Sequence, residues 1–161
     1  EAGIPIKVEQ ASAVALPFPD ESFDCVYSFG VLHHFPDIEK ALQEIKRVLA
    51  PGGTVMVMLY HRDSLLFAYS IIHLHGIAEN NKEIDPEKLL SNYSERNEGC
   101  PYTRAFTIKE GIDLFSQYFN DVEASVHYDV IDTKTQRKVK FEIDNKWNLG
   151  WHLVVKARKN K

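Results

Sequence analysis

Two adjacent histidines, His33 and His34, are the residues best suited to acid–base chemistry in this sequence. They follow the apolar run from Phe23 to Phe29 and the turn residue Gly30. An imidazole titrates near neutral pH and can accept a proton from a reacting group. One of the pair could therefore act as a general base. The alternative is that both rings pack at the entry to a helix.

Other polar residues have weaker patterns. His61 and Asp63 follow a second apolar run and could touch a substrate, or they could belong to a solvent-facing loop. His73 and His75 are two residues apart, so on a helix they would point to different faces and form a poor chelating pair. The two cysteines do not have the spacing of a zinc site. We therefore predict no metal site.

The elements that must position these residues alternate between strand and helix. After Asp37, a plausible N-cap, apolar residues recur at helical spacing until Pro51-Gly52-Gly53 ends the run. The nearly continuous apolar run that follows is typical of a strand buried on both faces of a parallel sheet. The resulting βαβ units predict a doubly wound α/β sheet. The expected strands of this half are Ile4–Glu9, Phe23–Phe29 and Thr54–Tyr60, with a helix over 38–49 and an irregular loop at 16–20.

Residues 63–104 break this rhythm, and about forty residues are too many for a simple connection. We interpret them as a helical insertion that caps the substrate side, with helices over 64–77 and near 86–93. Its apolar side chains could line an acceptor site or form a small core of their own. Thr107 is a plausible N-cap for a helix over 108–118, and strands are expected at 121–129 and 151–157. The chain is read as one domain, residues 1–161.

The run from Ala11 to Gly53 closely resembles class I S-adenosylmethionine-dependent methyltransferases, specifically the type 11 small-molecule family. The matching segments are Ala13–Asp20, Ser22–Val26, Val31–His34 and Glu44–Gly53. Looser similarity continues through Pro101–Arg104 and Gly150–Arg158, the latter resembling the family's antiparallel last strand. The resemblance implies a Rossmann-like fold, S-adenosylmethionine as cofactor, and a transferase that methylates a small-molecule acceptor. It also places Tyr60, His61, Tyr102 and Arg104 on the substrate side.

The resemblance further implies which residues meet the cofactor. Ser12 stands where the family often has an aspartate for the adenine amino group, so recognition would depend on the backbone of Ala13 and Val14. Ser28, Phe29 and Gly30 would face the methionine part, where Gly30 either permits close approach or merely eases a turn. We expect Ser12, Ala13, Phe29 and Gly30 to converge on one pocket. Some related enzymes of quinone biosynthesis hold a divalent metal and have glutamates at the positions of Gly30 and His33. Because this chain lacks those glutamates, we expect no metal at this motif.

No G-x-G-x-G sequence, the family's nucleotide loop, occurs in the chain. We therefore expect an N-terminally truncated fragment that binds the cofactor weakly alone. Its incomplete sheet edge should favour self-association. The competing hypothesis is a non-catalytic assembly module. A dehydrogenase-type nucleotide binder is a third reading, disfavoured because it lacks these motifs.

Composition narrows the remaining choices. The chain is 44% hydrophobic and 26% charged, which favours a folded protein. A net charge of −4 and a pI of about 6.0 argue against nucleic-acid binding. The longest apolar stretch, Leu65–Ile77, contains polar residues and is too short for a membrane span. Two cysteines define no disulfide framework, so a cytoplasmic location is expected.

Overall fold

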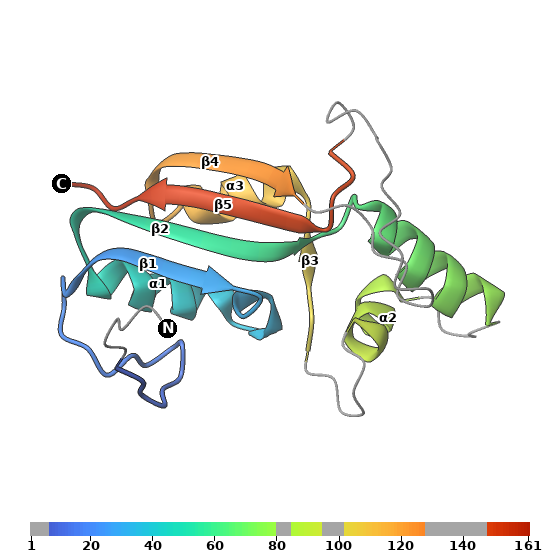
Figure 1. Ribbon diagram of the computed structural model, residues 1–161, viewed down its shortest axis with the longest axis horizontal. Helices are drawn as coiled ribbons and strands as arrows, with labels where there is room; N and C mark the ends of the chain where they lie inside the picture. Colours follow the sequence, from blue (N-terminus) through green and yellow to red (C-terminus); the bar gives the residue numbers. More distant parts are fainter. Residues whose placement is uncertain (1–6, 80–84, 95–101, 128–147) are drawn as a thin grey trace, which may run out of the picture.

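The computed structural model describes residues 7–79, 85–94, 102–127 and 148–161. The described strands form one mixed sheet in the order β1-β2-β5-β4, and β3 also pairs with β2 (Figure 1). The strands are β1 Phe23–Phe29, β2 Leu49–His61, β3 Ala105–Phe106, β4 Asn120–His127 and β5 His152–Arg158. The helical elements are η1 Leu32–His34, α1 Ile38–Val48, η2 Phe67–Ala78, α2 Pro86–Tyr93 and α3 Ile108–Ser116.

The predicted βαβ unit is present as β1, α1 and β2, with the two strands parallel. Strand β2 starts earlier than expected, at Leu49, and includes the Pro-Gly-Gly segment that was predicted only to end the helix. The register shifts here, because Phe23 pairs with Leu49 whereas Cys25 pairs with Thr54. Gly52 has a φ of +76°, which a residue with a Cβ rarely adopts, so the glycine permits this bulge.

Strand β5 is antiparallel to both β2 and β4, which confirms the orientation expected for the last strand. Strand β3 was not expected. It pairs in parallel with Tyr60 and His61 at the carboxyl end of β2. Two residues are too few to give a strand pattern in a sequence. This short pairing matters because it brings Arg104 to the end of the sheet.

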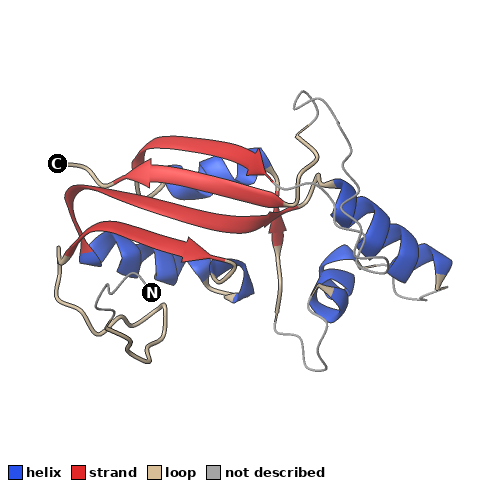
Figure 2. Cartoon of the chain, in the orientation of Figure 1, coloured by secondary structure: helices blue, strands red, loops and turns tan. Residues whose placement is uncertain are grey.

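Helices α1 and α3 pack on the same face of the sheet (Figure 2). Their apolar stripes meet alternate residues of β2 and β5, including Val55, Val57, Leu153 and Val155, each 0% exposed. Thr107 caps α3 as predicted, in a capping box with Glu110. Asp37 precedes α1 but makes no side-chain cap bond, and it pairs with Lys40 instead.

The insertion forms two helices with a small core of their own, which supports the second reading of its apolar residues. Phe67 and Ile71 of η2 pack with Leu89 and Leu90 of α2 and with Ala105. Helix η2 is a π-helix, so its hydrogen bonds span five residues rather than four, as from the Glu79 N–H to the Leu74 carbonyl.

The second face of the sheet is not covered by a described helix. Tyr27 is 62% exposed and Phe29 is 46% exposed on this face, and Met56 is half-buried. The expectation that β2 is buried on both faces therefore holds fully for one face only. The outer edge of β1 also has no strand partner within the described residues.

The strand expected at Ile4–Glu9 falls partly outside the described residues, and Lys7–Glu9 are not in a strand. No helix in the described ranges is long and apolar enough to span a membrane.

Candidate functional site

Four aromatic rings form a column at the carboxyl end of β2. The Tyr60 ring lies between His33, at a centroid distance of 3.8 Å, and Trp151, at 4.3 Å. The His34 ring follows at 4.3 Å from His33. The histidine pair and Tyr60 are distant in the sequence but lie in contact in the fold. This is the edge of an α/β sheet where ligands usually bind.

Gly30 and Leu32 determine how the histidine pair is presented. Gly30 has a φ of +74°, and this left-handed turn leads the chain from β1 into the 3-10 helix η1. Leu32 is 2% exposed and anchors η1 in the main core. As a result His33 points inward and is 1% exposed, whereas His34 is half-buried.

The contacts of His34 favour one of the two ring tautomers. Its Nδ1 lies 3.2 Å from the Tyr102 carbonyl and 3.0 Å from the Thr103 hydroxyl. A carbonyl can only accept, so Nδ1 is the donor and the lone pair of the neutral ring is on Nε2. The Thr103 N–H in turn donates to the Ser91 hydroxyl of α2 at 3.0 Å. The insertion thus orients His34.

His33 has a different environment. Neither of its ring nitrogens makes a hydrogen bond within the described part of the chain. Burial, together with the neighbouring His34, lowers the pKa of His33 to about 3. The ring is therefore uncharged at neutral pH, and its main contact is with the Tyr60 ring.

The other predicted substrate residues lie close in the fold. Arg104 donates its backbone N–H to the His33 carbonyl at 3.0 Å, and Tyr102 is 39% exposed beside it. His61 is 1% exposed on the helix-covered side, where its Nδ1 lies 2.9 Å from the Gly150 carbonyl. His61 therefore ties β2 to the segment before β5.

The predicted cofactor residues do not line one common groove. Ser12 to Ala15 form a tight turn, and Ala13 and Val14 pack against the core on the helix-covered side. Phe29 projects from the opposite face of the sheet. The expected convergence of Ser12, Ala13 and Gly30 with Phe29 is thus not seen in the groove that Phe29 lines.

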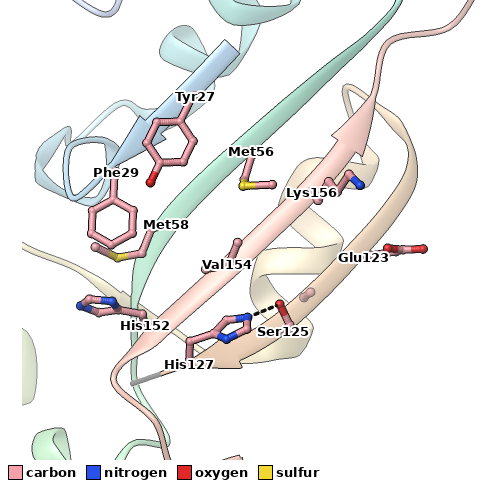
Figure 3. A pocket seen from close by; sticks show the side chains of 11 residues that line it. Tyr27, Phe29, Met56, Met58, Glu123, Ser125, His127, His152, Val154 and Lys156 are labelled. Carbon is pink, nitrogen blue, oxygen red and sulfur yellow. Dashed lines mark hydrogen bonds between the residues drawn. The ribbon is translucent and has the colours of Figure 1, made fainter. Parts of the chain in front are cut away.

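That groove runs along the open face of the sheet and has a volume of about 700 Å³ (Figure 3). Its floor is apolar, and its polar rim includes a 2.8 Å contact between Ser125 and His127. The edge of the Phe29 ring meets His152 at 5.3 Å, near the start of β5. Floor residues are Tyr27, Phe29, Met56, Met58 and Val154.

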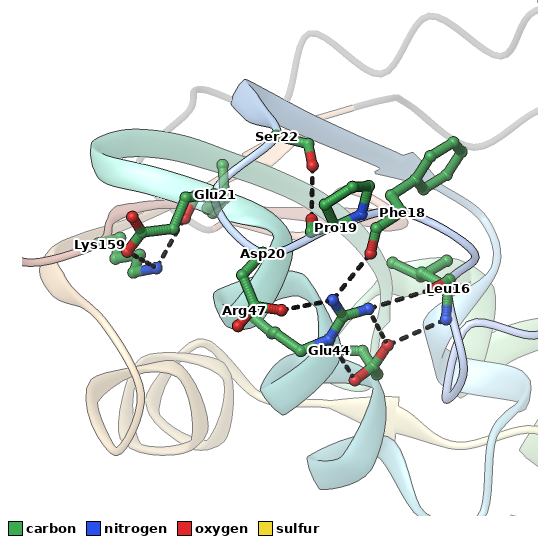
Figure 4. A network of polar contacts seen from close by, with 10 residues as sticks. Leu16, Phe18, Pro19, Asp20, Glu21, Ser22, Glu44, Arg47 and Lys159 are labelled. Carbon is green, nitrogen blue, oxygen red and sulfur yellow. Dashed lines mark hydrogen bonds and ion pairs between the residues drawn. The ribbon is translucent and has the colours of Figure 1, made fainter.

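The two strongest sequence motifs contact each other directly (Figure 4). Arg47 of α1 donates to the carbonyls of Leu16 and Phe18 and to the Asp20 carboxylate, at 2.8 to 3.0 Å. Glu44 receives two bonds from Arg47 and one, at 2.9 Å, from the Leu16 N–H. Helix α1 thus fixes the loop that follows the Ser12–Ala15 turn.

Glu44→Gln should loosen this loop. The Arg47 and Leu16 hydrogen bonds lower the pKa of Glu44 to about 2. Because the folded pKa lies below the ordinary value of 4.5, the stabilisation is complete above pH 4.5 and is lost as the pH falls toward 2. At pH 7 we expect a loss of about 1–3 kcal/mol in the free energy of unfolding, measured by urea titration. Glu39→Gln, on the exposed face of α1, is the control, and equal effects of both changes would contradict the role of Glu44.

Sequence reasoning missed Trp151 and Thr103. Trp151 could have been found from the antiparallel last strand, because such a strand begins where β2 ends. Thr103 carries no local signal, since its partner His34 is 69 residues away. Within the described ranges, no three His, Cys, Asp or Glu side chains are grouped as metal ligands would be.

Comparison with known sequences identifies a methyltransferase domain over residues 1–57. Over 57 residues the chain is 51% identical to a demethylmenaquinone methyltransferase from Thermus thermophilus, a match to 35% of this chain and 26% of that protein. It is 43% identical over 74 residues to the ubiquinone/menaquinone biosynthesis C-methyltransferase UbiE of Enterobacter sp., covering 44% of this chain and 29% of the relative. The matches thus span less than a third of these relatives' length.

Solved structures with the same fold can be aligned with nearly the whole length of this chain. A S-adenosylmethionine-dependent methyltransferase from Thermotoga maritima, described as a possible histamine N-methyltransferase, aligns with a TM-score of 0.62 and 21% identity, over 96% of this chain and 65% of its own. A second, from Methanosarcina mazei, has a TM-score of 0.53 and 20% identity, over 93% and 65%. The fold is that of Rossmann-like methyltransferases, as the sequence predicted.

Proposed function

We propose that this chain, whose first 57 residues match a methyltransferase domain and whose fold is that of S-adenosylmethionine-dependent methyltransferases, forms the acceptor side of such an enzyme. The observation that carries the proposal is the position of the ring column. His34, Tyr60 and Trp151 lie at the carboxyl end of β2, the edge where ligands bind in this architecture. The enzyme would methylate a small molecule.

The cofactor supplies a methyl group already activated by its positive sulfur, so the protein's work is alignment and proton removal. Among the residues of this chain, we assign Ser28 and Gly30, at the carboxyl end of β1, and the turn at Ser12, Ala13 and Val14 to cofactor binding, and we leave out Phe29 because it projects from the opposite face of the sheet. The left-handed φ of Gly30 fits a close backbone approach. Backbone donors of a G-x-G-x-G loop, which the sequence does not contain, would have to come from another segment.

His34 is the residue that we assign as general base. With Nδ1–H donating toward Tyr102 and Thr103, Nε2 is the ring nitrogen that would accept a proton from an acceptor hydroxyl or ammonium. His33 is a poor candidate for this step, because a group with a pKa of about 3 takes up a proton weakly at neutral pH. We assign it to orienting Tyr60.

We infer a planar aromatic acceptor from the same rings. Tyr102 is exposed beside the column, and Tyr60 and Trp151 are half-buried. Aromatic side chains favour stacked or edge-on contact with a planar molecule. The names of the Thermus and Enterobacter relatives contain menaquinone and ubiquinone, and a quinol, the reduced form of a quinone, is one such planar acceptor. We place the reaction in a reducing cytoplasm, to which the free, exposed thiol of Cys25 is suited.

The alternative function is assembly without catalysis. The apolar floor of the groove and the unpaired outer edge of β1 are surfaces that proteins normally cover. A second copy of the chain would cover both. The Glu123 and Lys156 side chains at the rim have opposite charges, which would suit a two-fold contact.

Cofactor titration combined with light scattering separates the two functions. For the 161-residue chain at micromolar concentration we expect a dimer, together with weak binding of S-adenosylhomocysteine by calorimetry. Tyr27→Lys should dissociate the dimer, because Tyr27 is 62% exposed on the contact face, whereas Tyr69→Lys, on the insertion, should not. A monomer with a sharp thermal transition would contradict self-association. Saturable cofactor binding that only the full-length gene product shows would favour catalysis over assembly.

A further inference from the structure

We infer that the methyl acceptor carries an oxyanion, namely a carboxylate, phosphate or phenolate, and that Arg104 binds it. This inference rests on the proposed function. Arg104 is half-buried, and within the described residues its guanidinium has no carboxylate or carbonyl partner. Its Nε is fully buried and makes no hydrogen bond.

The other half-buried arginines of the described chain are neutralised. Arg47 pairs with Glu44 and Asp20, and Arg62 pairs with Glu110. A guanidinium stays ionised at any physiological pH, so removing its N–H groups from water without an acceptor is costly. Arg104 is the exception to this pattern.

Arg104 is also held in place before any ligand arrives. Its backbone N–H donates to the His33 carbonyl at 3.0 Å. The guanidinium carbon lies 4.8 Å from the centroid of the Phe106 ring, which is itself 2% exposed. An arginine backed by an aromatic ring loses little freedom on binding and keeps its N–H fork for two acceptor oxygens.

Arg104 and the residues that contact His34 belong to one short segment of the chain. The preceding residue, Thr103, bonds the His34 ring at 3.0 Å, and Tyr102 accepts from the same ring. The segment 102–104 thus carries both the groups that hold the His34 ring and the arginine, whose guanidinium lies over Phe106. Fixing one end of the acceptor in this way places the other end for reaction, which is the main contribution to rate in a methyl transfer.

The test compares benzoate with benzamide, which have nearly the same shape and differ in charge. The side-chain N–H signal of Arg104 is followed by nitrogen-15 NMR in the 161-residue chain. We expect benzoate to shift this signal saturably and benzamide not to shift it. Arg104→Gln should weaken benzoate binding by about 10- to 100-fold. Arg62→Gln, which removes an arginine that is already paired with Glu110, should leave benzoate binding unchanged.

Three results would overturn the inference. The first is equal benzoate affinity in the wild type and in Arg104→Gln. The second is an Arg104 signal that benzoate does not shift, which would mean that a carboxylate of the chain already occupies the guanidinium. The third is a signal that responds to S-adenosylhomocysteine but not to benzoate, because the oxyanion would then belong to the cofactor. Should Arg104→Gln fail to fold, the wild-type titration still decides.

The readout does not require turnover. Benzoate binding at Arg104 in a protein without methyltransferase activity would leave the oxyanion site standing and refute the proposed function. Methyl transfer to a neutral acceptor, at a rate that Arg104→Gln does not change, would support the proposed function and refute the oxyanion site.

Discussion

His34→Ala is expected to lower the rate of methyl transfer by the full-length enzyme roughly 10²- to 10⁴-fold, the usual effect of removing a general base. The reason is geometric. The contacts with Tyr102 and Thr103 favour the proton on Nδ1, so that Nε2 would take the acceptor's proton. The free energy of unfolding should fall by about 1–3 kcal/mol, because the buried Thr103 hydroxyl loses a partner and the His34 ring leaves the column. Turnover and a urea titration measure the two effects.

His75→Ala is the matched control for this change. His75 is also half-buried and also stacks on an aromatic ring, that of Tyr93 at 4.1 Å, but it lies in the insertion. We expect its removal to leave the rate unchanged. An unchanged rate in His34→Ala, accompanied by a lower melting temperature, would show that His34 only packs.

His33→Phe is expected to reduce the acid sensitivity of this protein below pH 6.5. In the unfolded chain an imidazole titrates near 6.5, whereas in the fold burial lowers the pKa of His33 to about 3. Below pH 6.5 the unfolded state therefore binds a proton that the folded state does not. Stability is fully present above 6.5 and is lost as the pH falls through this window, by about 1.4 kcal/mol per pH unit.

Urea titrations at pH 7, 6 and 5 measure this slope. The phenyl ring keeps the stack on Tyr60 and removes two buried nitrogens that make no hydrogen bond in the described chain, so stability at pH 7 should be unchanged or higher. His73→Phe, at an exposed position of η2, should retain the wild-type slope. Parallel curves for the wild type and His33→Phe would contradict the buried, uncharged state of His33.

Much of the sheet could be predicted because its signals are local. The apolar spacing in α1, the β-branched run of β2 and the capping box at Thr107 each fit within a dozen residues. The start of β2 could not be predicted, because a Pro-Gly-Gly segment ordinarily ends regular structure. It enters the strand here through a register shift that depends on the left-handed φ of Gly52.

The candidate site was only partly predictable, because the sequence singled out the two histidines and Tyr60 but not Trp151 or Thr103, and it did not separate the roles of the histidines. His33 and His34 are the same residue type at adjacent positions, yet the turn at Gly30 and the burial of Leu32 point one ring inward and the other toward Thr103. No local pattern distinguishes them. The column with Trp151 likewise depends on β5 lying beside β2, which is a long-range pairing.

The most direct test of the proposed function is transfer of a labelled methyl group from S-adenosylmethionine by the full-length gene product. The acceptors are planar aromatic hydroxyl compounds, with and without a carboxylate, and a quinol is included. We expect label in the acceptor and an equal amount of S-adenosylhomocysteine, with transfer abolished or strongly reduced by His34→Ala. Saturable cofactor binding without label in any of these acceptors would contradict the assignment of this ring column as the acceptor site.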